Sequence, residues 1–241
     1  LLNDEKNMQA QLDAIKTASG AVHPVALFYC AEILRDSRQF TEAEKLYVQA
    51  EAGAAWWSEP SAALAELYLE TGQEDKAKAA YDQSFAIDPY NMRAYNQLIL
   101  LKYLQKFSTL ESHSRLKPGS NLPAFIIRYE PQDEVLAKLA VEWMEKIRPD
   151  IWSYFQITEL PAPTQIEMFP SHEEFGVRTT GLPWIGTVGA CTGNVIAMDV
   201  PRGGAADLMG NFDWARVLRH EYTHTVTLAL NVHVASENGV T

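Results

Sequence analysis

An internal repeat is the feature of this sequence that most restricts its fold. The segments FTEAEKLYVQA (40–50) and EDKAKAAYDQSFAIDP (74–89) align at an offset of 34 residues. Three pairs of identical residues coincide in that alignment: Ala43 with Ala77, Tyr47 with Tyr81, and Gln49 with Gln83. Small and bulky apolar residues that alternate at helical spacing over this period predict antiparallel helix pairs, each stacked on the next.

The second copy resembles the tetratricopeptide repeat at the positions that pack within and between its helices. These positions are Leu64, Ala65, Tyr68, Gly72, Ala77, Tyr81, Phe85 and Pro89. The first copy, residues 24–57, follows the same pattern but has Arg38 where the turn glycine is expected. The resemblance implies a helical array that recognises a peptide or a protein partner on its concave face; the alternative is a spacer packed on the second half of the chain.

Both ends of the array depart from the repeat. A third copy begins at NMRAYNQLILLKYLQ (91–105) and loses the pattern around residues 106–121, which predicts a divergent or capping helix. The first nineteen residues place Leu1, Met8, Leu12 and Ile15 on one face, so we expect one amphipathic helix there. We therefore assign residues 1–117 to helical repeats with flanking helices.

The residue pattern changes after the segment 117–123, which contains two Pro and one Gly and which we interpret as a linker. Apolar and β-branched runs predict strands at 124–129, 164–169 and 194–200. Residues 131–150 predict a helix, and Ser171 is positioned to cap another. Five residues are expected to face inward from the first of these helices: Leu136, Leu139, Ala140, Trp143 and Met144. Residues 123–241 are thus expected to form a mixed α/β unit.

The segment RVLRHEYTHTVTLAL (216–230) carries the clearest chemical signal. Asp213 can cap a helix here, and an apolar stripe follows it at helical spacing: Trp214, Val217, Leu218, Tyr222, Val226 and Ala229. His220 and His224 are one helical turn apart, so both imidazoles can bind one zinc ion. Glu221 lies about 100° around the helix from His220, where it can act as a general base toward a water molecule without binding the metal.

With this motif in place, the second half of the chain resembles the peptidase MA-like gluzincins, a group of HExxH zinc metallopeptidases. The stretches FIIRYEPQDEVLAKLAVEWMEKI, QIEMFPSHEEF, GNVIAMDVP and WARVLRHEYTHTV occur in the order that this family uses. The resemblance implies that residues 123–241 are the N-terminal subdomain of a zincin, with His220 and His224 as zinc ligands and Glu221 as the general base. It also implies that the strand near residues 194–200 is an edge strand that pairs with a peptide substrate, through Asn194, Val195, Ile196, Ala197 and Met198.

A gluzincin takes its third zinc ligand from a glutamate on a later helix, and we expect that residue beyond Thr241. Glu237 is the alternative within the chain, although it follows His224 by only thirteen residues. Two imidazoles alone bind zinc weakly, so we expect residues 1–241 to hold zinc incompletely and to have little or no peptidase activity.

Two classes of function therefore stay open. One is a zinc-dependent peptidase whose repeats bind a protein substrate or partner; the other is a repeat scaffold fused to an inactive zincin fold, acting as a protein-binding module. The net charge of −11 and the lack of a Lys and Arg cluster argue against nucleic acid. No apolar run approaches the roughly 20 residues of a membrane span. The family resemblance favours an exported or periplasmic bacterial protein over a cytoplasmic one.

Overall fold

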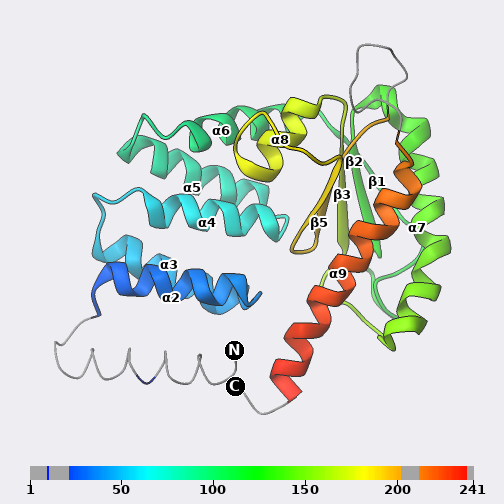
Figure 1. Cartoon of the computed structure of the whole chain (residues 1–241), viewed down its shortest axis with the longest axis horizontal. Coiled ribbons are helices and arrows are strands. Elements are labelled where there is room, and N and C mark those ends of the chain that lie inside the picture. Colours follow the sequence, from blue (N-terminus) through cyan, green and yellow to red (C-terminus); the bar gives the residue numbers. More distant parts are fainter. Residues whose placement is uncertain (1–9, 11–21, 202–211, 238–241) are drawn as a thin grey trace.

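The computed structural model describes residue 10 and residues 22–201 and 212–237. The described chain is rich in helix and contains one small mixed sheet (Figure 1). Helical hairpins lie on one side of the molecule, and the sheet with its long helices lies on the other. The amphipathic helix expected over the first nineteen residues falls outside the described residues. None of the described helices is long and apolar enough to cross a membrane.

Five helices form the hairpin array: α2 (Pro24–Asp36), α3 (Phe40–Gly53), α4 (Glu59–Glu70), α5 (Glu74–Ile87) and α6 (Met92–Leu104). The first residues of α3 and α5, Phe40 and Glu74, are 34 positions apart, as the internal repeat predicts. The matched residues of the two copies are buried: Ala43 and Ala77 are fully covered, and Tyr47 and Tyr81 are at most 2% exposed. Small residues at these positions let the helices of each pair approach closely.

The two hairpin turns share one backbone conformation despite their different residues. Gly72, between α4 and α5, has a φ of 72°, and Arg38, at the matching place between α2 and α3, has a φ of 63°. The left-handed region is disfavoured for a residue with a Cβ atom by roughly 1–2 kcal/mol. The substitution of Arg38 for the turn glycine thus leaves the turn intact at a cost in conformational energy.

The sheet contains five strands in the order β1-β2-β3-β5-β4: β1 (Ser108–Glu111), β2 (Phe125–Tyr129), β3 (Thr164–Phe169), β4 (Gly189–Thr192) and β5 (Val195–Asp199). The three central strands are parallel, and each outer strand is antiparallel to its neighbour. The strand expected at 164–169 is confirmed, and those expected at 124–129 and 194–200 are confirmed with ends shifted by one residue.

Two expectations about this region are wrong. The divergent or capping helix expected from the third copy is α6, but residues 1–117 were expected to be helical throughout, whereas residues 108–111 form β1, which pairs with β2. The sheet therefore begins before the 117–123 segment. The strand near 194–200 was expected at an edge, but β5 is hydrogen-bonded to β3 on one side and to β4 on the other. Strand β4 occupies that edge instead, because the short turn at Gly193 folds it back against β5.

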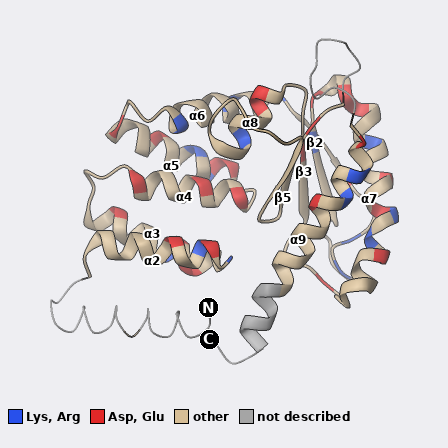
Figure 2. Ribbon diagram, in the orientation of Figure 1, with Lys and Arg blue, Asp and Glu red and all other residues tan. Residues whose placement is uncertain are grey.

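Helices cover both faces of the sheet. The elements are η1 (Pro131–Asp133), α7 (Glu134–Phe155), α8 (His172–Thr180) and α9 (Trp214–Glu237). Red and blue segments both occur along the ribbon of α7, so acidic and basic residues are interspersed in this helix (Figure 2). Ala140 and Met144 of α7 face inward as expected, whereas Leu139 is 47% exposed and was wrongly assigned to the inner face. Leu136 and Trp143 are partly buried against the same core.

Alternate residues of the central strands enter two different cores. Ile196 and Met198 of β5 pack with α7 and α9, while Ala197 joins a cluster that includes the buried residues of α4, α5 and α6. Phe169 of β3 and Phe175 of α8 belong to that second cluster as well. The helical hairpins and the sheet therefore share one continuous apolar core instead of meeting only through a linker.

Candidate metal centre

Helix α9 begins at the cap that the sequence predicts. An Asp213 carboxylate oxygen accepts a hydrogen bond of 3.0 Å from the backbone N–H of Arg216, and the Asp213 carbonyl accepts one from Val217. These bonds satisfy N–H groups that have no partner within the first turn of a helix. The cap fixes where the helix starts and hence which residues face the sheet.

The inward face of α9 is held by packing and by two tryptophans of α7. Leu218, Tyr222 and Val226 are fully buried, as the stripe predicts. The Trp152 indole donates a hydrogen bond of 2.7 Å to the Tyr222 hydroxyl, and the Trp143 indole donates one of 2.9 Å to the Ala215 carbonyl. This anchoring sets the rotation of α9, so His220 and His224, each two positions from the buried stripe residues on either side, are exposed.

His220 and His224 are brought together on the exposed face of α9. Their Nε2 atoms lie 3.0 Å apart, and their ring planes are nearly perpendicular at 84°. Two imidazole nitrogens bound to one tetrahedral zinc ion lie about 3.3 Å apart. The observed pair fits that requirement with only a small side-chain adjustment, so the donor set is chemically suited to zinc.

Glu221 lies beside the two histidines in a different environment. The residue is 8% exposed, whereas both imidazoles face solvent. Burial raises the pKa of the Glu221 carboxyl above its usual value, while charge on His220 and His224 and a hydrogen bond from the backbone N–H of Cys191 act in the opposite direction. A carboxylate held in this way is oriented and more basic than one in water, which suits a general base.

Strand β4 approaches α9 unusually closely at Gly189. A Cβ atom added there would lie 2.5 Å from Cγ1 of Val217 and 3.3 Å from Cγ of Glu221. Only a glycine leaves room for this contact, which brings the Cys191 N–H within reach of the Glu221 carboxyl. Neither Gly189 nor Cys191 was predicted from the sequence to be part of the site.

The third ligand is not found among the described residues. No group of three or more His, Cys, Asp or Glu side chains suited to a metal lies together in the described part of the chain. Glu237, the alternative ligand, is the last residue of α9, thirteen residues after His224 on the same helix. The side chain of Glu237 lies outside the described residues, so its part as a zinc ligand stays a prediction. A glutamate beyond Thr241 stays a prediction.

The residues predicted to bind substrate are not available for strand pairing. Val195, Ile196, Ala197 and Met198 are buried within β5, whose two sides are occupied. Asn194 lies in the turn before β5, where its N–H donates to the Glu70 carbonyl of α4. The sheet edge closest to Glu221 belongs to β4. The apolar pattern of residues 194–200 alone does not show whether that strand lies at an edge or between two neighbours.

A histidine–aspartate pair elsewhere in the α/β unit was not predicted from the sequence. His172 Nδ1 lies 2.6 Å from an Asp199 carboxylate oxygen, and His172 Nε2 lies 2.8 Å from the Ile185 carbonyl. Both nitrogens of this imidazole are used to join α8, β5 and the 181–188 loop. The arrangement therefore holds three segments together.

Neither a protein-family model nor any curated protein or solved structure matches this chain.

Proposed function

We propose that this chain is the metal-binding part of a zinc-dependent peptidase of gluzincin type. The observation that carries the proposal is the arrangement on α9: two imidazole Nε2 atoms lie 3.0 Å apart, and the buried Glu221 is directly beside them in the helix. Structural histidines are usually satisfied by other protein groups, whereas these two are exposed and face each other. The third ligand is proposed to come from a residue downstream of Thr241.

The chain's own residues divide the work as follows. His220 and His224 would hold the ion, which would supply Lewis acidity toward a carbonyl and toward a water molecule. Glu221 accepts the proton of the attacking water and returns it to the leaving amine. The Cys191 N–H keeps the carboxyl of Glu221 turned toward β4, so the base and the peptide meet at the same edge of the sheet.

The polypeptide substrate is proposed to add to the sheet at β4. This strand is antiparallel to β5 and is the last in the described sheet, so its outer backbone groups can pair with an extended peptide. Its first residue contacts α9 at Glu221. A peptide bound there would present a backbone carbonyl to the histidine pair.

The test compares the parent protein with three variants, each of which contains any native residues that follow Thr241. We expect the parent protein to cleave a fluorescence-quenched casein in the presence of zinc and to lose activity with a chelator. Glu221→Gln should abolish cleavage and keep zinc binding, while His220→Ala should abolish both. Glu173→Gln serves as the matched control, because Glu173 is an exposed glutamate on α8.

Cleavage that survives Glu221→Gln would contradict the role given to this residue. If the parent protein binds unfolded casein without cleaving it at any zinc concentration, the chain acts as a repeat scaffold on an inactive zincin fold. That second function is favoured by one observation, namely that the described residues supply only two ligands.

A further inference from the structure

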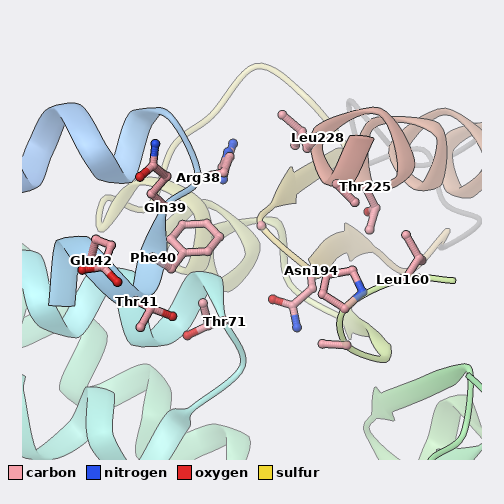
Figure 3. A pocket seen from close by; sticks show the side chains of 14 residues that line it. Arg38, Gln39, Phe40, Thr41, Glu42, Thr71, Leu160, Asn194, Thr225 and Leu228 are labelled. Atoms are coloured by element: carbon pink, nitrogen blue, oxygen red, sulfur yellow. The ribbon is translucent and has the colours of Figure 1, made fainter. Parts of the chain in front are cut away.

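A cavity of about 580 Å³ lies between the first helical hairpin and α9 (Figure 3). The turn from α2 to α3 forms one wall, with Arg38 and Phe40 directed into the space. Leu228 and Thr225 of α9 form the opposite wall, and Leu160 closes a third side. The helical hairpins and the α/β unit thus contribute to the same cavity.

The lining of this cavity suits an apolar side chain. Phe40, Leu160, Leu228 and Ala229 supply carbon surface, and Phe40 packs from behind against the core of the helical array. The side chain of Thr225 is engaged with the Glu221 carbonyl and with the Cys191 sulfur, so it offers no free polar group. An apolar group that enters such a space gains free energy in proportion to the surface it buries.

The cavity is built into the fold because its floor is fixed to α4. The Asn194 N–H donates a hydrogen bond of 3.3 Å to the Glu70 carbonyl. At Gly193, which has a φ of 64°, an added Cβ would lie 2.4 Å from the same oxygen. The turn between β4 and β5 therefore rests directly on the end of α4, and it holds the hairpins at a set distance from α9.

Arg38 provides an independent indication that this wall has a use beyond packing. The repeat places Gly72 in the equivalent turn, and Arg38 adopts the same left-handed conformation against its own preference. Its guanidinium lies 5.8 Å from the centroid of the Phe40 ring, at the mouth of the cavity. Strained non-glycine residues concentrate at functional sites, where their side chain is needed in a particular place.

The cavity is also continuous with the proposed peptide path. Thr225 follows Glu221 by one helical turn, and Gly193 directly follows the last residue of β4. From Cys191, whose N–H contacts Glu221, to Gly193 is about 7 Å along the strand. A peptide on the outer edge of β4 would therefore have a side chain at the cavity two or three residues from the bond that faces Glu221.

We propose that this cavity is a specificity pocket for an apolar side chain of the polypeptide bound along β4, with Phe40 and Arg38 of the repeats as its selecting wall. The proposal rests on the proposed function for the position of the peptide. It gives the helical repeats a direct part in substrate choice.

The test measures binding instead of cleavage, using Glu221→Gln protein. The probes are fluorescein-labelled ten-residue peptides of alternating Ser and Thr in which one Leu is moved through each position in turn. We expect Leu at one position to strengthen binding about tenfold over the Leu-free peptide, since burial of a leucine is worth that much or more. A benzoylphenylalanine at that position should cross-link to Phe40, Leu160 or Leu228.

Substitutions of cavity-lining residues distinguish a direct effect on binding of the Leu side chain from a general effect on folding. Ala162→Phe fills the cavity from the loop side and should remove the gain from Leu, whereas Asn121→Phe adds the same ring in an exposed loop and should leave it unchanged. Arg38→Gly should raise the melting temperature by relieving the turn while it reduces the gain from Leu at least threefold. A purely structural role for Arg38 would move stability and binding in the same direction.

The outcomes also distinguish this proposal from the peptidase proposal. A Leu-dependent gain that is lost in Ala162→Phe supports the pocket even if the parent protein cleaves nothing. Cleavage of casein combined with a gain from Leu that persists in Ala162→Phe overturns the pocket and leaves the peptidase proposal standing. Cross-links confined to residues outside the cavity would overturn it as well.

Discussion

Replacement of Gly189 by alanine tests the contact on which the proposed site depends. The added Cβ would lie 2.5 Å from Cγ1 of Val217, so strand β4 and helix α9 must separate by about 1 Å to reach ordinary van der Waals contact. Forced expansion of a packed contact costs about 1–3 kcal/mol of unfolding free energy. We expect a loss of that size in urea unfolding of Gly189→Ala.

The same change should impair the site more than the fold. The new methyl group would also lie 3.3 Å from Cγ and 3.4 Å from Oε1 of Glu221, so the carboxyl must turn away from β4. The nearest atoms to the new methyl group belong to Val217 and Glu221, whereas His220 and His224 are exposed to solvent. We therefore expect peptide hydrolysis to fall at least tenfold, while zinc affinity, measured by competition with a chromophoric chelator, stays within a factor of two.

A double variant separates these two effects. Val217→Ala alone removes two partly buried methyl groups, a loss of about 1 kcal/mol. It also removes the atom closest to the new methyl group. The loss of unfolding free energy in the double variant Gly189→Ala, Val217→Ala should therefore be about 1–2 kcal/mol smaller than the summed losses of the two single variants. Hydrolysis should stay low in the double variant, because the contact with Glu221 remains.

Gly186→Ala is the matched control, since an added Cβ at Gly186 meets no atom within 4 Å. Its unfolding free energy should change by less than about 0.5 kcal/mol. Strict additivity of the Gly189 and Val217 variants would refute the argument that β4 and α9 meet at these two residues. A Gly189→Ala protein with the stability and activity of the parent would refute the arrangement of the site itself.

Three further predictions concern the surroundings of the site. Trp152→Phe removes the hydrogen bond to the Tyr222 hydroxyl and should lower the unfolding free energy by about 1 kcal/mol in urea titration; an unchanged midpoint would show that this bond does not hold α9. Arg178→Met leaves the fully buried Glu167 carboxylate without its ion-pair partner and should lower the unfolding free energy by about 3–5 kcal/mol, measured by thermal and urea unfolding. Burial raises the pKa of the Cys191 thiol to about 11, so its alkylation by iodoacetamide should be slow at pH 8 and accelerate as the pH rises toward that value; rapid alkylation at pH 8 would contradict this.

The sequence could predict the helix caps, buried helix faces and strands that are determined by residues close together in the chain. The cap at Asp213, the buried stripe through Tyr222 and the strand at 164–169 follow from short-range periodicity and capping. The register of His220 and His224 follows from the same stripe, because the buried residues of a helix decide which positions face outward.

The features that could not be predicted depend on pairings between distant segments. Strand β5 has the composition of a buried strand, and that composition fits a position between two neighbours as well as one at an edge. Which strand closes the sheet is decided by the turn at Gly193 and by its contact with the Glu70 carbonyl, more than 120 residues away in the chain. The partners of β1 are likewise determined by the fold of the following segment.

This dependence bears on whether the repeats are a spacer. A spacer would leave the site intact if its contact with the α/β unit were loosened, but here the edge strand beside Glu221 ends in a turn that rests on the last carbonyl of α4. The buried Arg178 strengthens the connection, since it pairs with Glu167 of β3 and donates to the Leu69 carbonyl one residue earlier in α4. A displacement of α4 therefore moves β4 relative to α9. The helical hairpins and the strand beside the candidate metal centre are thus joined by direct contacts at the end of α4, and not by a linker alone.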